Sequence, residues 1–143
     1  MTDGVELMRT VTAAFAKGDL QPLMAALHPD INWQTASRRQ GPFKFHGDYQ
    51  GRAGATEVLA TISKDYTFFR LEPKEIIASG DVVWGYFDAG LFYDAKGTGT
   101  ARRSVEIEMA IRWRLKDGKV IEHKAFFDTA ELLRQQGVNL PAA

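Results

Sequence analysis

The chain has 143 residues, 45% of them hydrophobic, a length that suits one domain with one core. Its 18 Lys and Arg balance its 18 Asp and Glu, so no overall charge attracts the protein to nucleic acid or to an anionic membrane, and we expect neither as a partner. The lack of cysteine excludes a disulfide framework, a thiolate zinc site and a cysteine nucleophile.

The first residues, MTDGVELMRTV, carry acidic side chains and no long apolar run, unlike a signal peptide. No stretch of the sequence approaches the roughly 18 apolar residues that a membrane span needs. We therefore expect a soluble, unprocessed protein located in the cytoplasm.

The N-terminal part of the chain predicts three helices. Asp3 and Glu6 form a capping-box pattern at the start of a helix over about 4–17, in which apolar residues recur at helical spacing. A second, short helix has leucines on one face and ends before Pro29. Apolar residues again share one face over about 52–63, which predicts the third helix.

The segment between the second and third helices combines a short strand with a long loop. Residues 31–36 favour a strand, whereas 37–51 hold several glycines, prolines and charges that predict a loop. Long loops in compact domains are often lids or binding loops. His46, near Phe45 and Tyr49, either covers a pocket or is a solvated loop residue.

From residue 66 onward the pattern predicts strands rich in aromatic and β-branched residues. They are expected near 66–71, 74–79, 81–93, 102–115 and 119–127. Asp117-Gly118, within KDGK, is the signal of a two-residue hairpin turn. A final helix over about 129–136 ends at Gly137. Helices followed by an antiparallel meander indicate an α+β fold.

Four phrases of the sequence carry a family resemblance that spans nearly the whole chain. They are GDLQPLMAALHPDINW (18–33), YQGRAGATEVL (49–59), ASGDVVW (78–84) and WRLKDGKVIEHKAFFDTAELLRQQG (113–137). The chain resembles the SnoaL-like and ketosteroid-isomerase-like branch of the nuclear-transport-factor-two-like superfamily. The resemblance implies one cone-shaped α+β barrel over 1–143, with N-terminal helices packed on a strongly bent, mainly antiparallel sheet. It also implies a homodimer and a pocket between sheet and helices.

The same resemblance singles out two aspartates. It implies that the acid of AFFD, Asp128, reaches the pocket. A weaker similarity to limonene-epoxide-hydrolase-like members aligns Tyr86-Phe87-Asp88 with their Arg-x-Asp pair, so the acid is kept and the arginine is not. Trp33 and Thr35 stand where those members have a Tyr-x-Asn pair that holds the attacking water.

Asp88 and Asp128 are therefore the candidate catalytic residues. Two pocket carboxylates in unlike surroundings can divide acid and base roles, because a desolvated acid has a raised pKa and stays protonated. Asp128 has a structural alternative, since Asp128-Thr-Ala-Glu131 is also a capping box for the last helix. The two hypotheses remain open from the sequence.

The hairpin turn predicts how the last two strands pair. A two-residue turn places Asp128 opposite Ile107 and Phe126 opposite Met109, on the apolar face of the strand over 102–115. A bulge would instead bring Glu106 or Glu108 opposite Asp128.

We expect four apolar residues to line the pocket, namely Phe15, Trp33, Met109 and Phe126. Strand alternation also places Trp84, Tyr86 and Asp88 on one face. That face is either a ligand wall, which makes Trp84 and Tyr86 substrate-binding candidates, or an exposed or dimer-facing surface. We expect a homodimer through the outer face of the sheet.

The three histidines do not predict a metal site, because none has a histidine partner at i,i+4 or an HExxH context, and we expect no metal and no organic cofactor. His123 is expected on a strand surface. The leading hypothesis is an enzyme that uses aspartate acid/base chemistry on a small apolar or cyclic substrate, as an isomerase, cyclase, dehydratase or hydrolase. The alternative is a non-catalytic ligand-binding domain or accessory subunit, because one fold hosts both.

Overall fold

The computed structural model describes residues 3–37, 39, 41–94 and 102–141. Its helices are α1 (Gly4–Ala16), α2 (Gln21–Ala26), α3 (Gly51–Asp65) and α4 (Thr129–Gln135). Its strands are β1 (Leu27–Thr35), β2 (Gly47–Gln50), β3 (Tyr66–Ser79), β4 (Val82–Tyr93), β5 (Arg103–Lys116) and β6 (Lys119–Phe127).

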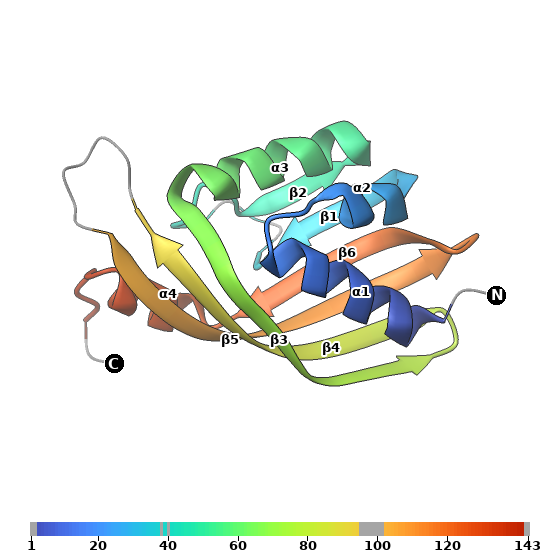
Figure 1. Cartoon of the computed structure of the whole chain (residues 1–143). Helices are drawn as coiled ribbons and strands as arrows, with labels where there is room; N and C mark the ends of the chain where they lie inside the picture. The colour runs from blue at the N-terminus through green and yellow to red at the C-terminus, as the bar shows by residue number, and fades with distance from the viewer. Residues whose placement is uncertain (1–2, 38, 40, 95–101, 142–143) are drawn as a thin grey trace.

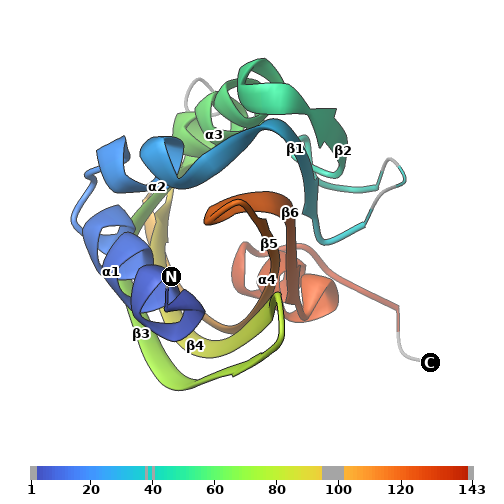
Figure 2. The same cartoon turned by 90° about the vertical axis from the view of Figure 1, so that its right-hand side faces the viewer.

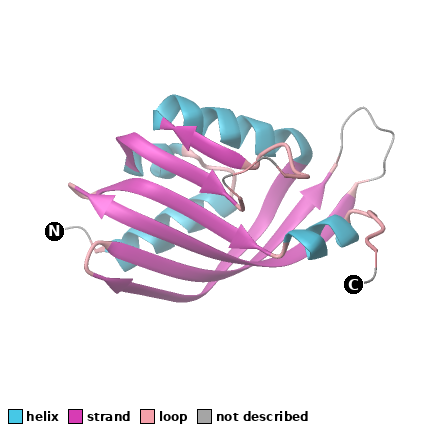
Figure 3. Ribbon diagram, turned by 180° about the vertical axis from the view of Figure 1, so that it is seen from behind, coloured by secondary structure: helices cyan, strands magenta, loops and turns pink. Residues whose placement is uncertain are grey.

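In the described part of the chain, six strands form one sheet in the order β2-β1-β6-β5-β4-β3. The sheet curls strongly, and α1, α2 and α3 lie across its open side (Figures 1 and 2). Helix α4 lies at the end of the sheet where β6 ends (Figure 3). The expected α+β architecture, with helices packed on a bent and mainly antiparallel sheet, is confirmed.

The helix ends follow the local sequence signals. The Asp3 carboxylate accepts hydrogen bonds from the backbone N–H of Val5 (3.0 Å) and Glu6 (3.3 Å), which satisfies free donors of the first turn of α1. Gly18, just after α1, has φ +83°, a conformation that favours glycine. The prediction that Asp3 begins α1 as its N-cap is confirmed.

The sheet contains pairings that local patterns did not predict. Strand β1 runs parallel to β6 and antiparallel to β2. Strand β2 lies within 37–51, which was expected to be a loop, and residues 38 and 40 of that segment are outside the described residues. Strand β3 is continuous where two strands were expected, with irregularities between Phe68 and Arg70 and between Pro73 and Glu75. In the sequence, the two short runs on either side of Pro73 cannot be distinguished from separate strands. Their pairing with the same strand, β4, shows that they form one strand.

The β5–β6 hairpin confirms the predicted turn but not the predicted pairing beyond it. Asp117 (φ 54°) and Gly118 (φ 74°) form the turn, and Leu115 pairs with Val120 as expected. The pairing shifts between Arg114 and Leu115, which leaves Ile121 as an extra residue. Since a shift of one residue moves each later side chain to the opposite face, the second half of β6 is inverted relative to the prediction.

The shift corrects two expected positions. Met109 pairs with Phe127, not Phe126, and Phe126 lies opposite Ala110 on the outer face. Strand β6 ends at Phe127, so Asp128 is not opposite Ile107. Continued by one residue, the observed pairing would bring Asp128 beside Glu108, the arrangement that a bulge was expected to produce.

Helix α4 covers the part of β5 that extends beyond β6. The Gln135 side chain accepts a hydrogen bond from the Glu106 backbone N–H (2.8 Å) and donates one to the Glu106 carbonyl (2.7 Å). A side-chain amide thus takes the place of a neighbouring strand at this edge. Leu132 of α4 is fully buried in the core.

No helix of the described residues is both long and apolar enough to cross a bilayer. No group of three or more His, Asp or Glu in the described ranges is arranged to hold a metal ion.

Candidate functional site

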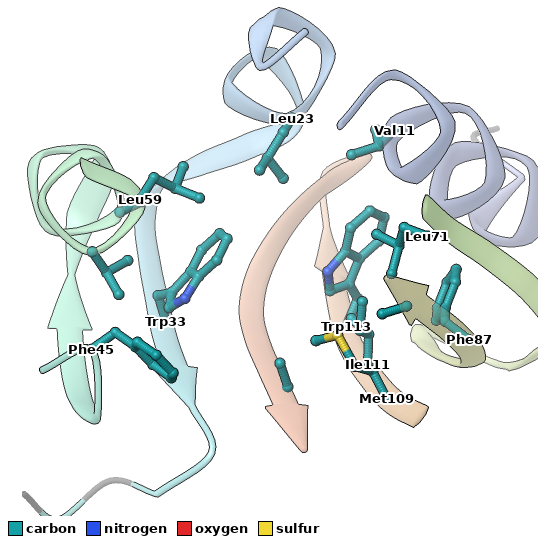
Figure 4. Close-up of a cluster of buried hydrophobic side chains, with 14 of the residues drawn as sticks. Val11, Leu23, Trp33, Phe45, Leu59, Leu71, Phe87, Met109, Ile111 and Trp113 are labelled. Carbon is teal, nitrogen blue, oxygen red and sulfur yellow. The ribbon is translucent and has the colours of Figure 1, made fainter. Parts of the chain in front are cut away.

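The inner face of the curled sheet and the three covering helices enclose a cavity of about 70 Å³. Figure 4 shows Val11 of α1, Leu23 of α2, Leu59 of α3 and the two indoles of Trp33 and Trp113 directed into this interior. All five side chains are buried. The cavity wall is therefore built from all three helices that cross the sheet and from strands on both sides of β6, namely β1 and β5.

A second cavity of about 50 Å³ adjoins the first. The two cavities share four lining residues, which are Thr35, Ile62, Phe68 and Met109. The remaining wall of the second cavity is apolar or aromatic and comes from the loop before β2 and from β3 to α4: Phe45, Tyr66, Leu91, Ile107, Phe127 and Leu132.

The loop before β2 closes the second cavity, which supports its predicted role as a covering segment. Phe43 and Phe45 stack on each other at 5.0 Å, and each lies about 6 Å from the Phe127 ring, at 6.2 and 6.1 Å. His46 is buried (7% exposed) and lies edge-on to Phe43 and Phe45, with ring centroids 5.2 and 5.7 Å apart, and neither of its ring nitrogens has a hydrogen-bond partner in the described residues. Burial without a partner lowers the pKa of His46. The alternative of a solvated His46 is wrong.

A third hollow, of about 190 Å³, adjoins the first cavity and is lined in part by exposed residues. It lies between the α1–α2 turn, with Gly18 and Leu20, and the start of β3, with Thr67. Phe15 and Phe68 line both the hollow and the first cavity, and their rings meet edge to face at 5.0 Å. These two rings belong to the wall that the first cavity and the hollow share.

Polar side chains of the first cavity are hydrogen-bonded within the protein. The Trp33 indole donates its N–H to Thr35 Oγ1 (2.8 Å), and the Trp113 indole donates to His123 Nδ1 (2.9 Å). The imidazole of His123 stacks on Trp33 with ring centroids 3.7 Å apart. Thr12, also in the wall, donates its hydroxyl to the Met8 carbonyl (2.7 Å).

His123 is neutral in this environment. Complete burial lowers the pKa of the His123 imidazole to about 3. Because an indole N–H only donates, Nδ1 must accept and the ring proton resides on Nε2. The expected surface position of His123 is wrong, since the bulge at Ile121 turns His123 and Ala125 inward.

The two predicted catalytic aspartates lie outside the cavities. The Asp88 carboxylate pairs with Lys74 Nζ at 3.4 Å on the outer face of the sheet. Asp128 is exposed and caps α4, accepting the Glu131 backbone N–H at 3.0 Å. Both line one groove of about 480 Å³ beside α4, together with Arg70, Glu106, Ile107, Glu108, Glu131 and Gln135. The structure thus brings the two aspartates to one surface groove, whereas no Asp, Glu, Lys or Arg of the described residues lines either cavity.

The six predicted substrate-binding residues divide between the two faces of the sheet. Phe15, Trp33 and Met109 line the first cavity. Trp84, Tyr86 and Phe126 lie on the outer face, and 40, 37 and 38% of their surface is exposed. Trp84 and Phe126 stack at 6.5 Å, and the Tyr86 hydroxyl donates to Glu108 at 2.7 Å.

Sequence reasoning missed several wall residues. Trp113 was predictable from the sequence, because it lies on the apolar face of β5. The charged residues that alternate with this face lie on the opposite side of the strand. His123 and Phe127 were not, because their inward orientation depends on the bulge.

Comparisons with known proteins agree with this architecture. The model of the SnoaL-like domain family matches residues 8–123. An NTF2-like protein of unknown function from Burkholderia pseudomallei K96243 superposes with a TM-score of 0.81 at 24% identity, over 94% of this chain and 98% of that chain. TerC, crystallised with polyporic acid, has a TM-score of 0.76 at 24% identity, with the same coverage.

An NTF2-like protein from Burkholderia thailandensis E264 has a TM-score of 0.77 at 20% identity, over 95% of this chain and 98% of that chain. No curated protein matches the sequence. At these identities the solved structures show a shared fold, and the family match covers most of the chain. The chain belongs to the SnoaL-like domain family and has its NTF2-like α+β fold.

Proposed function

We propose that this protein binds a small, uncharged, apolar molecule in the paired cavities beneath α1, α2 and α3. The observation that carries the proposal is the composition of the wall, which is aromatic and aliphatic and has no charged side chain among the described lining residues. A charged ligand would lose its hydration there without gaining a counter-ion, at a cost of several kcal/mol.

The polar atoms of the wall support the same ligand class. Trp33 and Trp113 direct their indole N–H groups to Thr35 and His123, so the wall satisfies its own donors without a ligand. The aromatic faces are left to contact the ligand, as is typical of small-molecule pockets. TerC, which has this fold, was crystallised with the small molecule polyporic acid, which is consistent with a ligand-binding role here.

Ligand binding accounts for the cavity better than aspartate acid/base catalysis inside it. Asp88 and Asp128, the proposed acid and base, lie in the outer groove and not in the cavity wall. His123 and Tyr66 are the titratable side chains of the described wall, and burial keeps the first neutral and raises the pKa of the second. Catalysis by Asp88 and Asp128 is the second candidate, favoured by their position in one groove.

We also propose that two copies associate through the outer face of the sheet. Trp84, Tyr86 and Phe126 form an exposed aromatic patch there, and Ile77 of β3 is 63% exposed. Burying such side chains against a second copy would remove apolar surface from water. The dimer would leave the hollow between Gly18 and Thr67 free, because that hollow lies on the helix side of the sheet.

Tryptophan fluorescence tests the ligand-binding proposal. The protein has three tryptophans, of which Trp33 and Trp113 line the cavity and Trp84 is exposed. In a Trp84→Phe background, emission reports on the cavity alone. Toluene should change this emission and raise the melting temperature, whereas benzoate and benzylammonium, of similar size but charged, should do neither. Equal responses to all three probes, or none to toluene, would contradict the proposal.

A further inference from the structure

The two cavities are individually too small for a ring-containing ligand. Their volumes are about 70 and 50 Å³, whereas an apolar cavity of roughly 150 Å³ is known to hold benzene. A ligand with one six-membered ring must therefore displace part of the wall of one cavity, and a longer ligand must use space from both cavities. The four residues shared by the two cavities form the wall that such a ligand meets.

Three of these four shared residues are held in place. Thr35 accepts the hydrogen bond of the Trp33 indole. Phe68 meets Phe15 edge to face. Ile62 belongs to α3, and its β-branched side chain has restricted rotation on a helix.

Met109 differs from these three neighbours. It lies on the inner face of β5 and is buried, and its side chain makes no hydrogen bond with the described residues. An unbranched thioether with three rotatable bonds adapts to irregular space more readily than the other side chains of this wall. Met109 is thus the shared residue that can move at least cost.

We propose that Met109 is a movable partition between the two cavities and determines the length of the ligand. The ligand is then an elongated uncharged molecule with an apolar group at each end. One end lies against Trp33 and Trp113, and the other against Phe45 and Phe127. This inference rests on the proposed ligand-binding function and adds the shape of the ligand and the residue that selects it.

The test compares a one-ring probe, benzene, with a two-ring probe, biphenyl, in the Trp84→Phe background. Met109→Ala removes the partition and should raise the affinity for biphenyl relative to benzene by about tenfold. Met109→Leu is the matched control, because it conserves volume but branches the side chain, so it keeps the partition and should not raise the ratio of affinities above that of the parent. An unchanged ratio in Met109→Ala would overturn the inference.

A second measurement needs no substitution at Met109. In protein labelled with ¹³C at the methionine methyl groups, biphenyl should shift the Met109 resonance and leave those of Met8 and Met24, which line neither cavity, in place. A response of the tryptophan emission without a Met109 shift would overturn the partition but leave ligand binding standing. If neither the emission nor any methyl resonance responds to benzene or biphenyl, the proposed function fails and the inference fails with it.

Discussion

The indole of Trp113 donates its N–H to Nδ1 of His123 at 2.9 Å, inside a wall that carries no charged side chain among the described residues. The pair joins β5 to β6, since the two residues are directly opposite in the sheet. His123 in turn stacks on Trp33 of β1. A neutral imidazole therefore links three strands across the cavity, and its protonation would break the hydrogen bond to Trp113.

Stability should depend on pH through His123. Its pKa is lowered from 6.5 to about 3 in the folded protein, so below pH 6.5 the unfolded chain takes up a proton that the folded chain does not. The free energy of unfolding should fall as pH decreases from about 6.5 toward 3, by about 1.4 kcal/mol per pH unit from this group. Urea unfolding at a series of pH values measures the slope. His123→Gln, which can still accept the Trp113 N–H, should reduce the slope, and an equal slope in both proteins would contradict the assignment.

Replacement of His46 by phenylalanine should stabilise the protein. The ring of His46 is buried beside Phe43 and Phe45, and both its nitrogens lack a partner in the described residues, which costs about 1–3 kcal/mol per unsatisfied buried polar group. A phenyl ring of similar shape removes that cost. Thermal unfolding at pH 7 should show a higher melting temperature for His46→Phe. His28→Phe is the comparison, because the partly exposed His28 accepts the Asp30 N–H at 2.9 Å and its loss should lower the melting temperature. A lower melting temperature for His46→Phe as well would contradict the prediction.

Two substitutions at Asp128 separate its capping role from a catalytic one. Asp128→Ala removes the acceptor for the Glu131 N–H and should lower stability by about 1 kcal/mol, whereas Asp128→Asn keeps an N-cap and should stay close to the parent. Asp3→Ala, at the equivalent cap of α1, is the comparison for a purely structural loss. Neither Asp128 variant should alter toluene binding in the cavity. If Asp128→Asn changes ligand affinity or abolishes turnover of an identified substrate at unchanged stability, the catalytic hypothesis gains over the capping one.

The proposed dimer predicts a concentration-dependent mass. Light scattering at micromolar concentration should give the mass of two chains, and Trp84→Lys combined with Phe126→Lys should give that of one, because lysines opposite each other in the interface cannot both stay solvated. Leu20→Lys is the control, because Leu20 is exposed on the helix-covered side of the sheet, and this variant should leave the dimer intact. A single-chain mass for the parent protein would contradict the proposal.

Many elements of the fold were predictable because their signals are local. The N-caps Asp3 and Asp128 begin α1 and α4, and the Asp117-Gly118 turn joins β5 to β6. The candidate site was predictable only in part. Phe15, Trp33 and Met109 lie in the cavity wall as expected, because each belongs to the apolar face of a regular element. The alternation that pointed to Trp84 and Tyr86 could not indicate which face of the sheet is covered.

The sequence by itself determined where helices begin, where the last hairpin turns and which residues share a face of β5, because caps, turns and side-chain periodicity act over a few residues. Only the tertiary structure decided which side of β6 faces the interior. One extra residue at Ile121 moves His123 and Phe127 to the cavity and leaves Phe126 on the outside. That bulge, like the parallel pairing of β6 with β1, depends on partners distant in the chain. Asp128 lies outside the cavity because β6 ends at Phe127 and the Asp128 carboxylate caps α4, whereas Asp88 belongs to β4 and pairs with Lys74 on the outer face.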